Sequence, residues 1–123
     1  MTKYLLDTQA LIWWFEANNR LPDEIKRLLD SKAIIMLSVA SLWEIIIKTK
    51  SGKLKLGRTL EYLLKKVEFE ILYINLNHEL RIRKLPNIHK DPFDRILIAQ
   101  SLVEKCILLT TDKMVKKYFK SSQ

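Results

Sequence analysis

Short apolar runs alternate along this chain with longer segments of helical periodicity. Runs rich in Leu, Ile and Val occur at residues 4–6, 33–37, 69–76 and 107–110, and they have the composition of buried strands. In the remaining segments apolar residues recur every three or four positions, which predicts helices at 9–16, 21–30, 39–50, 59–67, 77–82, 91–105 and from 112 onward.

Several of these helices carry start or stop signals. Ser38 is a suitable N-cap for the helix at 39–50, and Gly52 is placed to end it. Asp91 followed by Pro92 is a strong helix start, and Asn77 is the expected cap of the short helix that follows it. The helix at 39–50 is expected to face the core through Val39, Leu42, Trp43, Ile46 and Ile47.

Apolar strands that alternate with helices predict an α/β fold. We expect a three-layer α/β/α sandwich around a central parallel sheet of four or five strands, with right-handed crossovers. A chain of 123 residues has room for one hydrophobic core, so residues 1–123 are expected to form a single domain.

Four acids follow the predicted strands. In a parallel sheet the carboxyl ends of the strands share one edge, and binding sites gather there. Asp7 directly follows the first strand, and Asp112 follows the fourth. Glu44 lies in the helix after the second strand, and Asp94 lies in the first turn of the helix at 91–105. These acids are therefore expected to converge on one edge of the sheet.

Three of the acids also have a purely structural explanation. Asp112 can cap the last helix, and Asp94 can interact with the positive end of its helix dipole behind the cap Asp91. Glu44 can pair with Lys48 one turn later.

Asp7 is the hardest acid to explain structurally. A carboxylate directly after an apolar strand is partly desolvated and needs a partner, and Thr8 is the better cap for the following helix. The convergence of all four acids on one edge is harder to attribute to coincidence than any single position.

Several carboxylates at close range repel one another unless a cation lies between them. Hard oxygen ligands favour Mg²⁺ or Mn²⁺, and such an ion can orient a water, lower its pKa and stabilise charge on a phosphodiester. Zinc held by His89 with Asp91 is a weaker alternative, because the only other histidine is His78; His89 is interpreted as an exposed loop residue.

Composition adds a preference for an anionic partner. The chain has 22 Lys and Arg against 14 Asp and Glu, a formal net charge of +8, which fits RNA, DNA or an acidic protein. Cys106 is the single cysteine, which excludes an internal disulfide. No signal core precedes Asp7 and no apolar stretch reaches roughly 20 residues, so we expect a cytoplasmic protein with no membrane partner.

Four motifs resemble those of the PIN-domain nucleases, in particular the VapC-type toxins of bacterial toxin–antitoxin pairs. They are L-L-D-T at residues 5–8, S-L-W-E-I at 41–45, D-P-F-D-R-I-L-I-A-Q at 91–100 and L-T-T-D at 109–112. The resemblance covers nearly the whole chain in the right order, and the D-P-F-D-R helix start joined to the S-L-W-E helix is its most specific part.

This resemblance implies a metal-dependent endoribonuclease that uses Mg²⁺ or Mn²⁺. It also implies a cognate antitoxin that blocks the site, in a homodimer or a hetero-oligomer with the antitoxin. The catalytic, metal-binding quartet of the family corresponds here to Asp7, Glu44, Asp94 and Asp112. Thr8 and Thr110 match positions where a hydroxyl supports the acids or the waters of the metal. Asp91, by comparison with Asp94, is a helix cap.

The chain departs from the family pattern in two places. Gln9 stands where relatives often have histidine. The family fold commonly ends in a short fifth strand, but after Tyr118 only residues 119–123 remain, so this strand is in doubt.

Two surface features are candidates for contacts with partners. Basic runs that can guide RNA towards the acids comprise Lys48, Lys50, Lys53, Lys55 and Arg58, and Arg81, Arg83, Lys84, Lys90 and Arg95. Arg95 and Lys48 are the candidate substrate contacts. Trp13, Trp14 and Phe15 are consecutive and cannot all face the core, so they serve either core packing or an interface with a subunit or the antitoxin.

Three other functions compete with this interpretation. A non-catalytic RNA- or protein-binding domain of the same fold would not need all four acids. A phosphate-accepting receiver domain would place an aspartate after the third strand, where this chain has Tyr73, Ile74 and Asn75. A DNA-cleaving nuclease shares the same metal chemistry and is separated only by tests on substrates.

Overall fold

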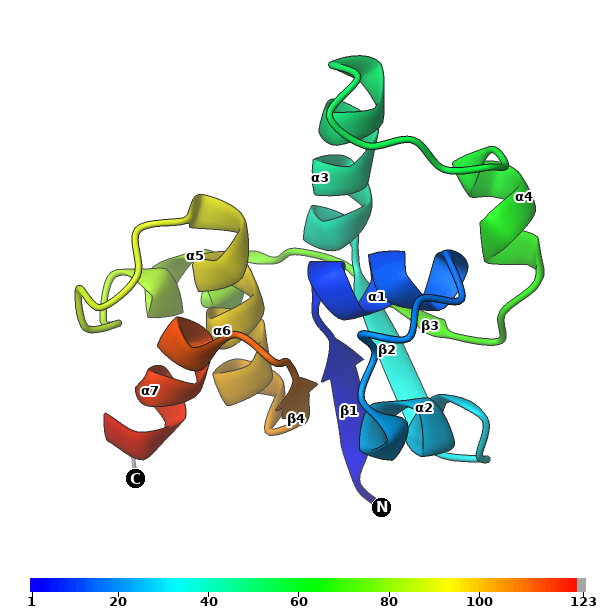
Figure 1. Cartoon of the computed structure of the whole chain (residues 1–123). Coiled ribbons are helices and arrows are strands. Elements are labelled where there is room, and N and C mark those ends of the chain that lie inside the picture. Colours follow the sequence, from blue (N-terminus) through cyan, green and yellow to red (C-terminus); the bar gives the residue numbers. More distant parts are fainter. Residues whose placement is uncertain (122–123) are drawn as a thin grey trace.

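The computed structural model describes residues 1–121 of the chain (Figure 1). The elements are, in order, β1 (Lys3–Leu6), α1 (Thr8–Phe15), α2 (Asp23–Leu29), β2 (Ile34–Ser38), α3 (Val39–Lys50), α4 (Leu60–Lys65), β3 (Glu70–Leu72), α5 (Leu76–Ile82), α6 (Pro92–Glu104), β4 (Ile107–Leu109) and α7 (Lys113–Ser121). Every predicted strand and helix is present. The largest difference is β3, which has three residues where eight were expected.

The strands form one parallel sheet in the order β3-β2-β1-β4. Leu5 on β1 is level with Met36 on β2 and with Leu108 on β4, and the next residues, beginning with Leu6, pair in the same way. Within residues 1–121 the sheet has these four strands, and residues 119–121 belong to α7 where a fifth strand was in question. Ser122 and Gln123 lie outside the described residues.

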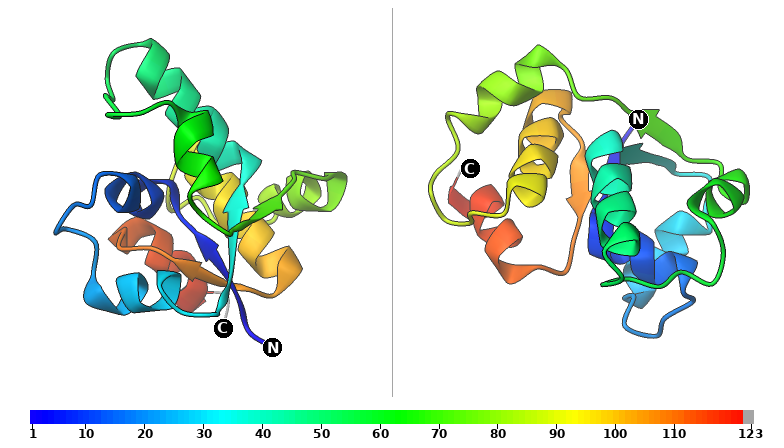
Figure 2. Two further views of the ribbon diagram at one scale, coloured as in Figure 1. Left: turned by 90° about the vertical axis from the view of Figure 1, so that its right-hand side faces the viewer. Right: turned by 90° about the horizontal axis from the view of Figure 1, so that it is seen from above.

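Helices cover both faces of the sheet, as Figures 1 and 2 show. Because side chains alternate along a strand, Leu5 and its neighbours on β2 and β4 pack against α6 and α7, whereas Leu6 and its neighbours pack against α1 and α2. The two resulting apolar clusters include Leu97 and Tyr118 on one side and Leu11 and Ile25 on the other. This confirms the three-layer α/β/α sandwich.

Helix α3 turns a different face to the core from the one predicted. Its buried residues are Ala40, Ser41, Glu44 and Ile45, whereas Trp43 is 57% exposed and Ile46 and Ile47 are also exposed. The helix is apolar on two sides, so periodicity could not identify the inner one. The end of α3 also projects beyond the sheet, as seen at the top of Figure 1. Nearer the start of the helix, the exposed Trp43 meets the Phe93 ring edge to face, with ring centroids 5.5 Å apart.

The helix ends follow the expected capping chemistry with two corrections, one at α5 and one at α1, where Asp7 and not Thr8 is the N-cap. Ser38 caps α3 and Asp91 caps α6, as predicted, and Gly52 follows α3 with a φ of 79°. Helix α5 is capped by Asn75 instead of Asn77, because β3 ends early and the chain enters the helix two residues sooner. Among the described residues, no helix has the length and apolar character that crossing a membrane requires.

Candidate active site

A pocket at the carboxyl edge of the sheet brings the four predicted acids together. It has a volume of about 280 Å³. The loops after β1 and β4 and the helices α3 and α6 supply, respectively, Asp7, Asp112, Glu44 and Asp94. The rest of its lining consists of Thr8, Gln9, Ile12, Lys48, Asp91 and Thr111.

Asp7 is a helix cap as well as a pocket residue. It is 6% exposed, and its Oδ1 accepts a 2.8 Å hydrogen bond from the backbone N–H of Ala10, which makes it the N-cap of α1. The prediction that Thr8 is this cap was wrong, because the helix begins one residue earlier than expected. Thr8 instead donates from Oγ1 to Oγ of Ser41 at 3.0 Å, and this bond joins α1 to α3.

The surroundings of Asp7 oppose its ionisation. Burial is the main cause that raises the pKa of Asp7 above its ordinary value of 3.8. Hydrogen bonds from the Thr110 side chain and from the N–H of Ala10 lower the pKa, and the negative charges of Asp112 and Glu44 raise it. Thr110 therefore favours the charged form of Asp7, and its role as a supporting hydroxyl stays a prediction.

Glu44 holds a buried oxygen that has no partner. The residue is 8% exposed, and its Oε2 lies 2.9 Å from Nζ of Lys48, the helical pair that the spacing allowed. Its Oε1 is buried and has no hydrogen-bond partner among the described residues. A desolvated carboxylate oxygen without a partner costs free energy, so this atom calls for a cation or a donor.

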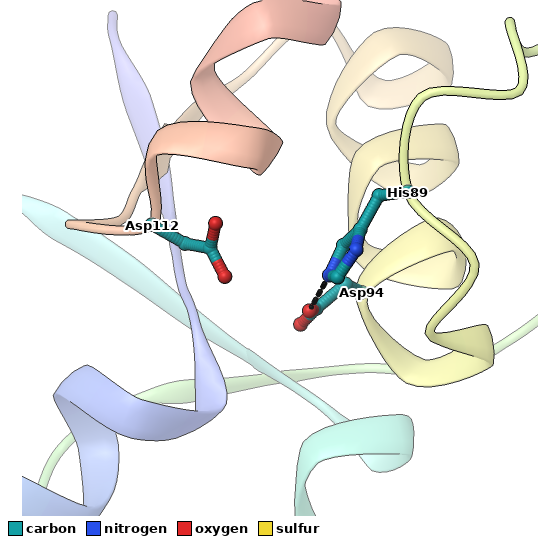
Figure 3. A group of neighbouring side chains, drawn as sticks. All are labelled: His89, Asp94 and Asp112. Carbon is teal, nitrogen blue, oxygen red and sulfur yellow. Dashed lines mark hydrogen bonds and ion pairs between the residues drawn. The ribbon is translucent and has the colours of Figure 1, made fainter.

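Asp94 does not cap α6, because Asp91 is the N-cap. Oδ1 of Asp91 accepts hydrogen bonds from the N–H groups of Phe93 and Asp94 at 2.9 and 3.1 Å. The Asp94 carboxylate therefore points into the pocket, where its Oδ2 lies 2.6 Å from Nε2 of His89 (Figure 3). Burial is the main cause that raises the pKa of Asp94 to about 6. The hydrogen bond and charge of His89 lower this pKa, and the charges of Asp91 and Asp112 raise it.

Asp112 has the structural role that was weighed for it and also faces the pocket. Its Oδ1 accepts from the N–H groups of Met114 and Val115 at 2.8 and 3.3 Å at the start of α7. Its own N–H donates to Oγ1 of Thr110 at 3.1 Å. The cap bonds use only Oδ1, and the carboxylate still lies beside Asp94 and His89 (Figure 3).

His89 is the pocket neighbour that the sequence interpretation missed. It is half-buried, and it can offer a ligand atom within 4.8 Å of ligand atoms of Asp94 and Asp112. The zinc alternative had paired it with Asp91, which is instead occupied as a cap. One feature of the sequence could have indicated this position of His89. The loop from Pro86 to Asp91 is short, so His89 must lie close to the start of α6.

Arg95, the predicted phosphate contact, has structural bonds in the folded chain. Its guanidinium donates to the carbonyls of Ile82, Pro86 and His89 at 3.2, 3.2 and 3.1 Å, and to the Tyr118 hydroxyl at 3.0 Å. Three of these acceptors share Nη1 and the fourth is bonded to Nη2, so this side of the guanidinium is bonded to the loop and to α7. Arg95 thus has a structural role that closes the loop before α6, and its contact with a phosphate stays a prediction.

The pocket has the chemistry of a divalent cation site. Neighbouring acids contribute to the raised pKa of Asp7 and of Asp94, Glu44 holds an unpartnered buried oxygen, and the donors are mostly carboxylate oxygens. A divalent ion would relieve the repulsion between the acids and satisfy Oε1 of Glu44 together. The residues present therefore fit such an ion.

Comparisons with known proteins agree with this geometry. The family described as "PIN domain" matches residues 4–120. A crystal structure of VapBC2 from Rickettsia felis, bound to a DNA fragment from its promoter, is similar with a TM-score of 0.70 and 17% identity over 95% of this chain and 93% of that one. A toxin–antitoxin complex from Klebsiella pneumoniae is similar with a TM-score of 0.63 and 24% identity over 94% and 89%.

A third similar structure is DNA-bound VapBC from Salmonella typhimurium, with a TM-score of 0.65 and 18% identity over 96% of this chain and 93% of that one. At these identities the likeness shows the fold. The comparison with curated proteins gave no match.

Proposed function

The chain belongs to the PIN domain family, and we propose that it is a metal-dependent endoribonuclease and the toxin of a toxin–antitoxin pair. The observation that carries this proposal is the convergence of four acids on one pocket, in which Oε1 of Glu44 is buried without a partner. In a domain that only binds RNA or protein, the repulsion between these carboxylates would have no function.

Asp7, Glu44, Asp94 and Asp112 would hold one or two Mg²⁺ or Mn²⁺ ions. When bound, such an ion supplies positive charge for the phosphodiester and lowers the pKa of an attacking water. The protein keeps Asp7 fixed through its cap bond and Thr110, so this carboxylate needs no reordering when the ion binds. Lys48 lies at the pocket and can contact a phosphate, at the cost of its pairing with Glu44.

An antitoxin is the proposed protein partner, in a hetero-oligomer or beside a homodimer. The similar structures from Rickettsia, Klebsiella and Salmonella are toxin–antitoxin or VapBC complexes. Trp13 and Trp14 are half-buried and line a groove between α1 and α2, next to Leu21 and Lys26. We propose that an antitoxin segment lies in this groove and places a basic side chain among the acids.

The groove is tested with Trp14→Ala and Trp13→Ala in a binding assay with the antitoxin encoded beside this gene. We expect at least a tenfold loss of affinity for Trp14→Ala with an unchanged circular dichroism spectrum, because interface aromatics contribute strongly. Unchanged affinity in both variants would place the antitoxin elsewhere.

The nuclease proposal is tested by incubating labelled RNA and DNA with wild type, Asp7→Asn and Asp94→Asn, with Mg²⁺, with Mn²⁺ or with EDTA. We expect wild type to cleave RNA only with metal, and both variants to lose about 100-fold or more in rate. Glu16→Gln removes an exposed acid outside the pocket and serves as the matched control. Cleavage of DNA alone would favour the DNA nuclease. RNA binding without cleavage would favour the non-catalytic domain.

A further inference from the structure

His89 is held in place by its backbone, so its imidazole is not needed to hold the loop. Its N–H donates to the hydroxyl of Tyr118 at 2.7 Å, and its carbonyl accepts from that hydroxyl at 3.0 Å and from Arg95 at 3.1 Å. Tyr118 is only 1% exposed, so this anchor belongs to the core. The loop therefore keeps its position whatever side chain stands at residue 89.

The imidazole is directed at the acids of the pocket. Its Nε2 lies 2.6 Å from Oδ2 of Asp94, and Figure 3 shows Asp112 facing the same space from the start of α7. Ligand atoms of the three residues lie within 4.8 Å of one another. Neighbouring ligands of an octahedral ion, at about 2.1 Å from it, are roughly 3 Å apart, so the Nε2–Oδ2 pair would open slightly and the more widely spaced atoms would close in around an ion.

A second observation in the same pocket points to a cation. Oε1 of Glu44 is a buried atom with no partner among the described residues, and the Glu44 side chain as a whole is 11% exposed. Glu44 reaches the pocket from α3, an element separate from the one that carries His89. Cationic charge beside Asp94 and Asp112 would therefore also compensate this oxygen.

We propose that His89, Asp94 and Asp112 form a mixed nitrogen and oxygen site for a first-row transition ion such as Mn²⁺, and that His89 gives the pocket its preference for Mn²⁺ over Mg²⁺. Mg²⁺ takes oxygen ligands almost exclusively, whereas transition ions accept imidazole nitrogen. This inference rests on the proposed function, because Asp94 and Asp112 belong to the catalytic quartet. It adds a ligand that the four-acid site lacks.

The test uses pulsed electron paramagnetic resonance on the full chain loaded with one equivalent of Mn²⁺. Imidazole bound to Mn²⁺ is expected to give a ¹⁴N modulation, which changes when histidine is labelled with ¹⁵N and disappears in His89→Gln. The glutamine amide can still hydrogen-bond Asp94, so this variant separates metal ligation from positioning. Lys90→Gln, an exposed neighbour in the same loop, is the control that keeps the signal.

Calorimetric titration gives the second readout. His89→Gln is expected to weaken Mn²⁺ binding about tenfold or more and to change Mg²⁺ binding less than threefold. Absence of nitrogen modulation in Mn²⁺-loaded wild type would overturn the proposal, as would equal losses for both ions. Cleavage of RNA is measured separately: wild type that shows the nitrogen signal but cleaves no RNA would refute the nuclease and leave the metal site standing.

Discussion

At the scale of single residues, the Asp7 carboxylate is used twice. One oxygen caps α1 through the N–H of Ala10, and the residue also faces the pocket beside Glu44 and Asp112. The cap needs only an acceptor oxygen, whereas a metal site needs the negative charge. Substitution by asparagine therefore separates the two uses.

We predict that Asp7→Asn keeps the fold and loses the metal response. Asparagine is as good an N-cap as aspartate, and the amide removes a charge that Glu44 and Asp112 repel. In metal-free buffer the melting temperature should be equal to that of wild type or higher. The rise that Mg²⁺ or Mn²⁺ causes in wild type should be absent. Asp7→Ala should lose about 1 kcal/mol through the cap as well.

Asp94 gives a prediction on pH. Its pKa is raised from 3.8 to about 6 in the folded protein. When folding raises the pKa of an acid, its protonated form stabilises the fold. This contribution is fully present at pH values below the pKa of the unfolded state, and it is lost as pH rises through the pKa of the folded state. In metal-free buffer the unfolding free energy of wild type should therefore fall by about 1–3 kcal/mol, relative to Asp94→Asn, between pH 3.8 and about 6.

Denaturant titrations at several pH values measure this difference. Saturating Mn²⁺ should reverse it above pH 6, because the ion binds the ionised carboxylate. A constant difference between wild type and Asp94→Asn across the range would contradict the raised pKa.

At the scale of elements, the sequence predicted the kinds and order of helices and strands, since periodicity and caps such as Ser38 and Asp91 are local signals. The prediction was wrong where the sequence offers two equally good local signals. Asp7 and Thr8 are both good caps, and α3 is apolar on two sides. The convergence of the acids was predictable because parallel strands fix one edge.

The contacts of His89 and Arg95 were not predictable. They depend on where α7 docks against the loop before α6, which no local pattern encodes.

The docking of α7 against the loop before α6 leads to a further prediction. Tyr118→Phe removes the hydroxyl that bonds His89 and Arg95 and leaves the ring packed in the core. We expect a loss of about 1–2 kcal/mol in unfolding free energy, because the N–H of His89 loses its acceptor. Faster amide hydrogen exchange in the loop from Pro86 to Asp91 should accompany it. Unchanged exchange there would show that Tyr118 does not hold the loop.

At the scale of the whole molecule, a chain of net charge +8 surrounds an acidic pocket. The positive charge can attract RNA from a distance, while the pocket requires a cation before a phosphate can enter. The basic run after Glu44, from Lys48 to Arg58, follows α3 away from this pocket. Binding of RNA should therefore depend strongly on salt.

We predict that changing Lys53 and Lys55 together to glutamine reduces the slope of log K against log salt for single-stranded RNA by about 1.4, or about 0.7 per lost phosphate contact. Lys3 and Lys32, at the opposite edge of the sheet, provide the matched pair of substitutions and should leave the slope unchanged. Equal effects of both pairs would indicate attraction by net charge alone.

The central claim is that the acidic edge of the sheet binds a divalent ion. The most direct measurement is anomalous diffraction from crystals of the full chain grown with Mn²⁺. We predict an anomalous peak within about 2.5 Å of carboxylate oxygens in the pocket of Asp7, Glu44, Asp94 and Asp112, and its loss in Asp94→Asn crystals. An empty pocket at saturating Mn²⁺, with the acids in the same positions, would contradict the account.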